Sequence, residues 1–461
     1  MELSAMELSA LRLGRGTFLK LVGGAAAAAA APPWAAASYA SGPRDSAQPL
    51  TFWSLESIQS GMSKLVSLHN RLHPRQPVSA INFNFIENNT YKTAIKVAMA
   101  GNAPPDIFFD FVGDRAFSFV PDGEAAIVND AYKQYDWRGR FYSWMVDRYT
   151  APFGEPYGVS TTVRPGSIYG IPTGGYANYM WYNKDLFRKL ALAVPRTYQE
   201  LLAVCAKLKA AGYIPLAFGN KDTFSGGHLL DYVAYQVAGP DVHYGTMEGS
   251  VLYTNRKEVQ ALQALQDLGT RGYLGKDFNG LPSVQAQEGL FFTGRAGMHM
   301  MGSWFLGAIA QAKPSFNVGV FLPPPMQGQP YRVVGDCSGY QVAAKSPREK
   351  LALAFLDTLT STQGMPIYQN AGSATTGINT TIPANKNVSL AVPAAYRSLA
   401  QDMLRPLPAR LYSYTGNITD PGLSDNVILP ALQALLAGSE SPAQVARRLA
   451  AAQKKVFPRA Q

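Results

Sequence analysis

YGIPTGGYANYMWYNKDLFRKLALAVPRTYQELLAVCAKLKAAGYIPLAFG, residues Tyr169 to Gly219, is the stretch that decides the fold of this chain. Its pattern predicts a strand, a short paired turn, a helix, a second helix and another strand. Pro-Arg-Thr at 195–197 is the start signal of the second helix, because Thr is a favoured N-cap residue. Nothing in the stretch is catalytic, so its importance lies in the architecture that it predicts.

Strand and helix patterns also alternate on the N-terminal side of this stretch. Strands are predicted over 48–54 and 78–86, helices over 56–72 and 91–100, and a buried strand over 106–111. Alternation with short connections predicts an α/β fold with a mostly parallel sheet. Because 461 residues exceed what a single small core holds, two domains are expected.

The N-terminal residues 1–40 have the order of a secretory signal. Arg12 and Arg15 precede an apolar run from Leu21 to Ala31, and small residues that suit a cleavage site follow. The run RLGRGTFLK is similar to a twin-arginine signal, but Gly16 stands where that motif has its second Arg, so ordinary secretion remains the alternative. The segment holds no Cys for a lipid anchor, and the apolar run is too short to span a membrane. Residues 41–49 are interpreted as a linker.

Composition argues against several classes of protein. Two cysteines, Cys205 and Cys337, cannot form a disulfide framework; we expect buried thiols, with one long-range disulfide as the alternative. The five histidines are isolated, so no metal site or other cofactor is predicted. The net charge is +10, but the basic residues are scattered, which argues against nucleic-acid binding. No nucleophile elbow or phosphate loop occurs, and a monomeric, non-catalytic protein is predicted.

Five short motifs occur in order along the chain, and together they resemble the extracellular solute-binding proteins of ABC importers. The resemblance is to the sugar-binding, maltose-binding-like branch of that family. The motifs are Gly101–Phe109, Tyr169–Pro172 with Tyr182–Phe187, Phe292–Met298 with Gly302-Ser303-Trp304, Gly319–Pro323 and Gly335–Val342.

This resemblance implies a periplasmic-binding-protein type of fold, with two α/β lobes joined by a multi-crossing hinge. The first lobe would comprise residues 50–171 and 323–362, and the second residues 172–322 and 363–461. The crossings would lie near 171–176, 322–325 and 360–366. A ligand held between the lobes would favour hinge closure, and the closed receptor would then dock on a membrane permease.

The resemblance also implies the residues of a ligand site. Trp304 is expected to be an aromatic platform for a sugar ring, because a flat ring packs on the apolar face of a sugar. Trp53 follows the first strand, where packing in the core is the alternative. The other expected site residues follow predicted strands, lie at a crossing or occupy loops along the cleft: Asp110, Asp114, Arg115, Tyr176, Asn178, Phe224, Asp336, Tyr412 and Tyr414.

Two other functions remain open at this point. A secreted carbohydrate-active enzyme would need two facing carboxylates, whose separation in space a sequence does not reveal. The same fold could also bind a polyamine, a phosphorylated polyol or a metal chelate. A polyamine site would hold several acids and a phosphate site several basic residues, whereas the expected site residues are mainly aromatic. That composition favours a neutral sugar.

Overall fold

The computed structural model describes residues 49–56, 58–86, 88–101, 103–112, 119–120, 123–151, 164–371, 381–407 and 411–457. The predicted export signal over 1–40 and all but the last residue of the predicted linker lie outside these ranges. Within them, no helix has both the length and the apolar character needed to cross a membrane.

The described strands form one mixed sheet whose order is β2-β1-β3-β8-β4-β6-β5, with β7 and β9 also paired to β4. Parallel pairs join β1 to β2 and β3, and β5 to β6, whereas β4 and β8 run antiparallel to their neighbours. The prediction of a mostly parallel sheet was therefore wrong at its centre, where β4 runs from the first lobe into the second and β8 runs back beside it. The strands are β1 (Leu50–Ser54), β2 (Ile81–Phe85), β3 (Ile107–Phe111), β4 (Ile171–Asn183), β5 (Ile214–Ala217), β6 (Ala296–Gly302), β7 (Val318–Phe321), β8 (Gly335–Val342) and β9 (Ile382–Pro383).

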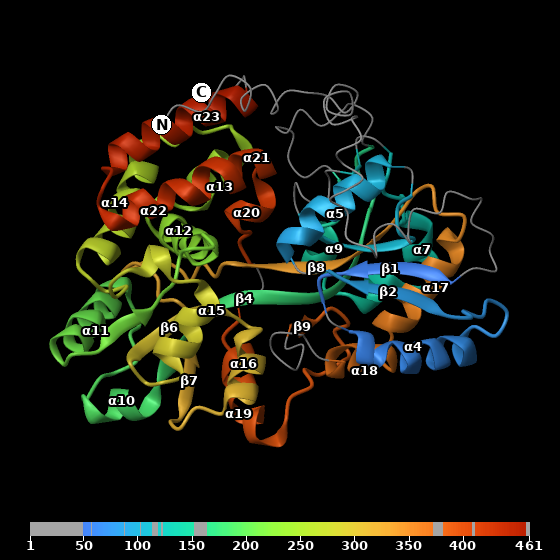
Figure 1. Ribbon diagram of the computed structural model, residues 1–461, viewed down its shortest axis with the longest axis horizontal. Helices are drawn as coiled ribbons and strands as arrows, with labels where there is room; N and C mark the ends of the chain where they lie inside the picture. The colour runs from blue at the N-terminus through green and yellow to red at the C-terminus, as the bar shows by residue number, and fades with distance from the viewer. Residues whose placement is uncertain are drawn as a thin grey trace.

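Strand β4 connects the two lobes. Its residues 171–177 pair with β8, and its residues 178–183 pair with β6 and β7. Figure 1 shows β4 and β8 side by side across the middle of the molecule, between two groups of helices. The short turn predicted before the helix is absent: β4 continues to Asn183, whose side chain accepts a hydrogen bond from the Leu186 N–H and so caps α10 (Lys184–Lys189).

Gly174 lies inside β4 because the chain packs closely there. A Cβ atom at Gly174 would come within 2.3 Å of the Thr381 hydroxyl, and one at Gly175 would come within 2.5 Å of the Met145 methyl group. The two glycines therefore allow Thr381 and Met145 to pack closely against β4 at the crossing, and they do not form a turn.

The first lobe packs helices against β1, β3 and β8 around Phe52, Phe108, Tyr340 and Phe355. Helix α4 buries Met62, Leu65 and Leu68, which recur at helical spacing as the sequence predicted. The helices of this lobe are α4 (Gln59–Leu72), α5 (Asn88–Ala100), α7 (Asn129–Gln134), α8 (Trp137–Arg140), α9 (Ser143–Asp147), α17 (Glu349–Thr360) and α18 (Gly364–Asn370).

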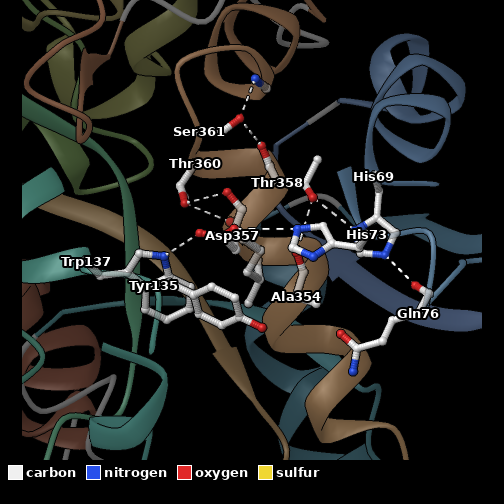
Figure 2. Close-up of polar contacts among 12 residues, drawn as sticks. His69, His73, Gln76, Tyr135, Trp137, Ala354, Asp357, Thr358, Thr360 and Ser361 are labelled. Carbon is white, nitrogen blue, oxygen red and sulfur yellow. Dashed lines mark hydrogen bonds and ion pairs between the residues drawn. The ribbon is translucent and has the colours of Figure 1, made fainter. Parts of the chain in front are cut away.

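A polar network ties α4, α8 and α17 together (Figure 2). Asp357 of α17 is bound by the Arg140 guanidinium at 2.7 Å and by the Trp137 indole N–H at 3.1 Å, and His73 lies 3.6 Å away. His69 stacks on His73 and its two ring nitrogens contact the Thr358 hydroxyl and the Gln76 carbonyl. We call these side chains the Asp357 network.

The second lobe covers both faces of β4. Tyr176 and Met180 face a core formed with α11, α12, α14, α22 and α23, whereas Ala177, Tyr179 and Trp181 face α16 and α19. Thr197 caps α11 by accepting from the Glu200 N–H, which confirms the predicted start. The helices are α11 (Tyr198–Ala210), α12 (Phe224–Val237), α13 (Pro240–Glu248), α14 (Arg256–Thr270), α15 (Ser283–Ala286), α16 (Phe305–Ala312), α19 (Arg397–Leu404), α20 (Thr415–Ile418), α21 (Pro421–Leu423), α22 (Leu429–Ala437) and α23 (Pro442–Val456).

Two predicted lobe boundaries differ from the packing. Met365, Tyr368, Ile382 and Ala384 belong to the first core, although residues after 362 were assigned to the second lobe. Residues 323–334 pack on the second lobe: the Tyr232 hydroxyl donates to the Pro324 carbonyl, and Val333 and Val334 lie in second-lobe cores. We propose that the second crossing lies along 334–337 and the third between residues 384 and 399.

The two cysteines are free buried thiols and belong to different cores. Cys205 packs in the second lobe and Cys337 in the first. The expected buried thiols are confirmed, and the alternative of a long-range disulfide is not formed.

Candidate ligand-binding site

Three aromatic rings meet on the second-lobe side of the crossing. The Tyr176 ring of β4 lies 5.5 Å from the Tyr414 ring at 29° and 5.4 Å from the Trp304 ring at 72°. Trp304 stands at the start of α16 and is half-buried, while Tyr176 and Tyr414 are almost fully buried. With Asn178, His228 and Phe224, described next, these rings form what we call the ring cluster.

The two small residues before Trp304 explain how its ring reaches the strand. Gly302 ends β6 and pairs with Asn178 of β4. A Cβ atom at Gly302 would approach the Trp304 ring to 2.1 Å, so glycine leaves the space that the indole occupies beside the strand end. The sequence Gly302-Ser303-Trp304 thus places an aromatic ring beside β4.

Asn178 and His228 place polar atoms among these rings. The Tyr414 hydroxyl donates to Asn178 Oδ1 at 2.8 Å, and His228 Nδ1 lies 3.0 Å from the same oxygen. Burial lowers the pKa of His228 to about 3 and raises the pKa of Tyr414 well above its ordinary value. Both side chains are therefore neutral at physiological pH, and the cluster offers hydrogen bonds without a net charge.

Phe224 closes the cluster at the first turn of α12. Its ring is 37% exposed, lies 4.1 Å from the His228 ring and 6.1 Å from the Trp304 ring. Thr223 before it adopts a left-handed backbone, with φ of 60°, a strained conformation for a β-branched residue. Sequence reasoning missed His228, although its spacing of four from Phe224 puts both on one helix face.

Asp336 lies directly behind the cluster and is fully buried. Its Oδ1 atom is 3.4 Å from Arg148 Nε, and it accepts the Cys337 N–H at 3.2 Å. Arg148 also donates to the Leu411 carbonyl at 3.0 Å, so it links the first lobe to the second. Burial alone would lower the pKa of Arg148, but the Asp336 carboxylate outweighs this effect and raises it. Asp336 thus holds the crossing together through an ion pair that sequence reasoning did not foresee.

The remaining expected residues lie apart from the ring cluster or outside the described residues. Trp53 is buried in the first core, where β1 meets β2 and β3, which matches its alternative interpretation as a core residue. Asp110 lies on β3 opposite Gly339 of β8, and Tyr412 packs its ring 5.0 Å from Tyr235. Asp114 and Arg115 lie outside the described residues.

A second acidic group stands at the end of β1 in the first lobe. The Tyr368 hydroxyl donates to Glu56 Oε2 and lies 3.2 Å from the Thr173 hydroxyl, and the Ser338 hydroxyl lies 3.5 Å from Glu56 Oε1. Burial, together with the Glu56 carboxylate, raises the pKa of Tyr368 well above its ordinary value. Glu56 was missed, although its place after the first strand is a usual one for ligand contacts in α/β folds.

A cavity of about 810 Å³ lies on the other face of β4. It is lined by Trp144 of the first lobe, Ile382 of β9 and Leu404 of α19, among others, and by none of the predicted site residues. Trp144 packs where a Cβ of Gly175 would lie, whereas Tyr176 and Asn178 face the ring cluster. The ring cluster and this cavity are therefore on opposite faces of the crossing.

Comparisons with known proteins agree with this architecture. The family model described as bacterial extracellular solute-binding protein matches residues 74–366. The chain is similar to the multiple sugar-binding protein of Streptococcus mutans serotype c, with 24% identity over 251 residues, 52% of this chain and 58% of that protein. It is also similar to the sn-glycerol-3-phosphate-binding periplasmic protein of Rhizobium meliloti, with 27% identity over 211 residues, 43% of this chain and 46% of that protein. The chain spans about half the length of the curated relatives it matches.

Solved structures match over most of the chain. A chitin oligosaccharide binding protein superposes with a TM-score of 0.72 and 22% identity, covering 89% of this chain and 99% of the other. RafE in complex with raffinose superposes with a TM-score of 0.69 and 17% identity, covering 89% and 100%. At these identities the likeness shows the fold, and it agrees with two α/β lobes about a crossing.

Proposed function

Because the chain belongs to the bacterial extracellular solute-binding proteins, we propose that it is the receptor of an ABC importer and binds a sugar or small oligosaccharide. The observation that carries this proposal is the ring cluster: two tyrosines and a tryptophan beside a neutral amide and imidazole, at the crossing between two lobes. Aromatic faces pack against the C–H face of a sugar, and neutral polar atoms bind its hydroxyls.

Hinge closure is the mechanism that this arrangement supports. Strands β4 and β8 run from one lobe to the other and pair over residues 171–177, so a change in their twist moves one lobe relative to the other. A ligand that touches the ring cluster on one lobe and the Glu56 region on the other would bind the closed form better and shift the population toward it. The closed form would dock on the membrane permease.

Export accompanies this function. The family is extracellular, and the n-, h- and c-regions of residues 1–40 support removal of a signal peptide by the general or the twin-arginine route. We propose further that the protein has no catalytic activity and acts as a monomer without a cofactor.

A phosphorylated polyol is the second candidate ligand, because one group of relatives is named for sn-glycerol-3-phosphate binding. Phosphate binding favours bidentate arginines or helix N-termini. Arg148, which lies behind the ring cluster, is engaged by Asp336 and by the Leu411 carbonyl. The ring cluster itself offers neutral donors and acceptors, which supports a neutral sugar over a phosphate.

A thermal-shift screen of the purified protein tests these candidates. The probes are β-D-galactopyranose, raffinose, N,N′-diacetylchitobiose, sn-glycerol 3-phosphate and spermidine. A ligand that binds only the folded state raises Tm, by about 2.7 kcal/mol of stability at a hundred-fold excess over Kd. A shift with a neutral sugar, and no product after prolonged incubation, is the expected result. A shift only with the phosphate or the polyamine, or release of reducing ends, would contradict the proposal.

A further inference from the structure

The hydrogen bonds of Asn178 determine which atom of His228 carries its proton. Asn178 Oδ1 accepts the Tyr414 hydroxyl proton at 2.8 Å and also contacts His228 Nδ1 at 3.0 Å. An amide oxygen is an acceptor only, so the hydrogen of this second contact must sit on Nδ1. In a neutral imidazole the other nitrogen, Nε2, is then a bare acceptor.

The same amide has a donor that the protein does not use. Asn178 is only 1% exposed, and its Nδ2 atom has no hydrogen-bond partner among the described residues. Leaving a buried donor unsatisfied is costly, so natural proteins rarely keep one without a purpose. Orientation of the amide is set by the Tyr414 hydroxyl, which cannot ionise in this environment because burial raises its pKa well above the ordinary value.

The His228 ring lies among aromatic faces. The His228 ring is 4.1 Å from both the Phe224 and the Tyr414 rings, and the Trp304 ring lies 6.1 Å from it. The unpartnered Asn178 donor and the His228 acceptor belong to two side chains that share a hydrogen bond within the ring cluster. A single chemical group that both accepts and donates a hydrogen bond would satisfy the two, and on a sugar that group is a hydroxyl.

This inference rests on the proposed function. We propose that Asn178 and His228 both hydrogen-bond to one hydroxyl of a neutral sugar, whose ring stacks in the ring cluster. The hydroxyl oxygen accepts from Asn178 Nδ2, and its hydrogen is donated to His228 Nε2. An analogue that lacks this hydroxyl leaves both atoms unpaired, and a phosphate or carboxylate oxygen meets the lone pair of Nε2 with no hydrogen to donate. The pair therefore determines specificity for neutral polyhydroxylated ligands.

The ligand-free protein provides the first test. In ¹⁵N-detected imidazole NMR, His228 is expected as the tautomer with hydrogen on Nδ1, with no protonation between pH 5 and pH 8. A hydrogen on Nε2 in the ligand-free protein would overturn the inference without touching the proposed function.

Titration calorimetry provides the second test, with the sugar from the thermal-shift screen that raises Tm most and with its monodeoxy analogues. We expect one monodeoxy analogue to bind the native protein at least about thirty-fold more weakly than the parent sugar. His228→Phe keeps a ring between Phe224 and Tyr414 but removes the acceptor. It should weaken binding of the parent about ten-fold and reduce discrimination against that analogue to within about three-fold. Asn178→Ala should act in the same direction.

His73→Phe in the first lobe is the matched control, since it is the same substitution in the Asp357 network. It should leave sugar affinity and discrimination unchanged. Unaltered discrimination in both His228→Phe and Asn178→Ala would overturn the inference while sugar binding itself upholds the proposed function. If His73→Phe lost as much sugar affinity and discrimination as His228→Phe, the loss would be a general effect on the fold. That result would also overturn the inference. Absence of binding to every neutral sugar would remove the proposed function and this inference together.

Discussion

The Asp357 network of the first lobe and the ring cluster of the second both combine aromatic side chains with a buried histidine. They differ in how fully their polar groups are hydrogen-bonded within the protein. Asp357 receives the Arg140 guanidinium at 2.7 Å. Figure 2 shows that it also faces the Trp137 indole N–H and His73, and that His69 uses both of its ring nitrogens. In the ring cluster, the buried Asn178 amide keeps a donor without a protein partner among the described residues. A network whose donors and acceptors bind one another stabilises a fold. A network that keeps a hydrogen-bond donor without a protein partner can use that donor to bind a ligand.

Two buried histidines, His69 of the first lobe and His243 of the second, differ in the sign of their pKa shifts. Burial is the largest effect on His69, and it lowers the pKa of that side chain. His243 of α13 lies between Glu258 of α14 at 3.0 Å and Asp231 of α12 at 3.2 Å. Burial alone would lower the pKa of His243, but the two carboxylates outweigh it and raise the pKa to about 9. The contributions of His69 and His243 to stability should therefore be lost at opposite ends of the pH range.

The largest expected effect is the alkaline loss of stability in the second lobe. The folded pKa of His243 is raised above its unfolded value, so its contribution is complete below about pH 6.5 and is lost as pH rises toward 9. A shift from 6.5 to about 9 corresponds to roughly 3 kcal/mol. Urea unfolding between pH 6 and pH 10 measures it. In His243→Gln this slope should vanish; a slope that persists would assign it to another group.

Asp357→Ala should destabilise the first lobe by about 2–3 kcal/mol, because it leaves Arg140 and the Trp137 indole without their shared acceptor. Sugar affinity should not change, since the network lies away from the ring cluster. Denaturant unfolding and calorimetry on the same preparation separate the two quantities. The control is Asp130→Ala, whose ion pair with Lys133 is exposed and should contribute less than about 0.5 kcal/mol. A parallel fall in affinity would contradict the division between the two assemblies.

Trp304→Ala changes the ring cluster and leaves the Asp357 network intact. We expect it to reduce the free energy of sugar binding by about 2 kcal/mol, or about thirty-fold in Kd, because a half-buried aromatic anchor is removed. Tyr331→Ala removes an exposed ring elsewhere on the second lobe and should leave Kd unchanged. Equal Kd values for Trp304→Ala and the native protein would exclude Trp304 from the site.

The smallest effect concerns His69. Its folded pKa is depressed below the unfolded value, so its stabilising contribution is complete above about pH 6.5 and is lost as pH falls. Between pH 6.5 and pH 5 the native protein should lose slightly more stability than His69→Asn does, as measured by urea unfolding. Identical acid profiles would show that His69 takes up no proton on unfolding.

Local patterns predicted much of the architecture. The apolar spacing of α4, the Thr197 cap of α11 and the Gly-Ser-Trp end of β6 are short-range features, and each has the expected structure. The predicted turn before Asn183 and the boundary at residue 362 failed because they depend on distant partners. Strand β4 is held straight by β8, β6 and β7, and Tyr368 is drawn into the first core by contacts with Glu56 and Thr173.

The site followed the same division. Tyr176, Asn178, Phe224, Trp304 and Tyr414 were expected from the resemblance, and the structure brings them together. Whether they bind a ligand stays a prediction. His228 was not expected, because its spacing of four from Phe224 places it on the same helix face but does not reveal its hydrogen bond to Asn178 on β4. Arg148 was missed for the same reason, since its partner Asp336 is far away in the sequence.

By itself, the sequence determined the α/β class and the aromatic character of the candidate site. Those properties depend on periodicity and on residue type, which act over a few positions. Only the tertiary structure decided that β4 is continuous between the lobes and that Asp336 forms an ion pair with Arg148. It also decided that Asn178 Oδ1 contacts both the Tyr414 hydroxyl and His228 Nδ1. Hydrogen-bond partners are assigned by distance in space, and the residues concerned are separated by up to 236 positions along the chain.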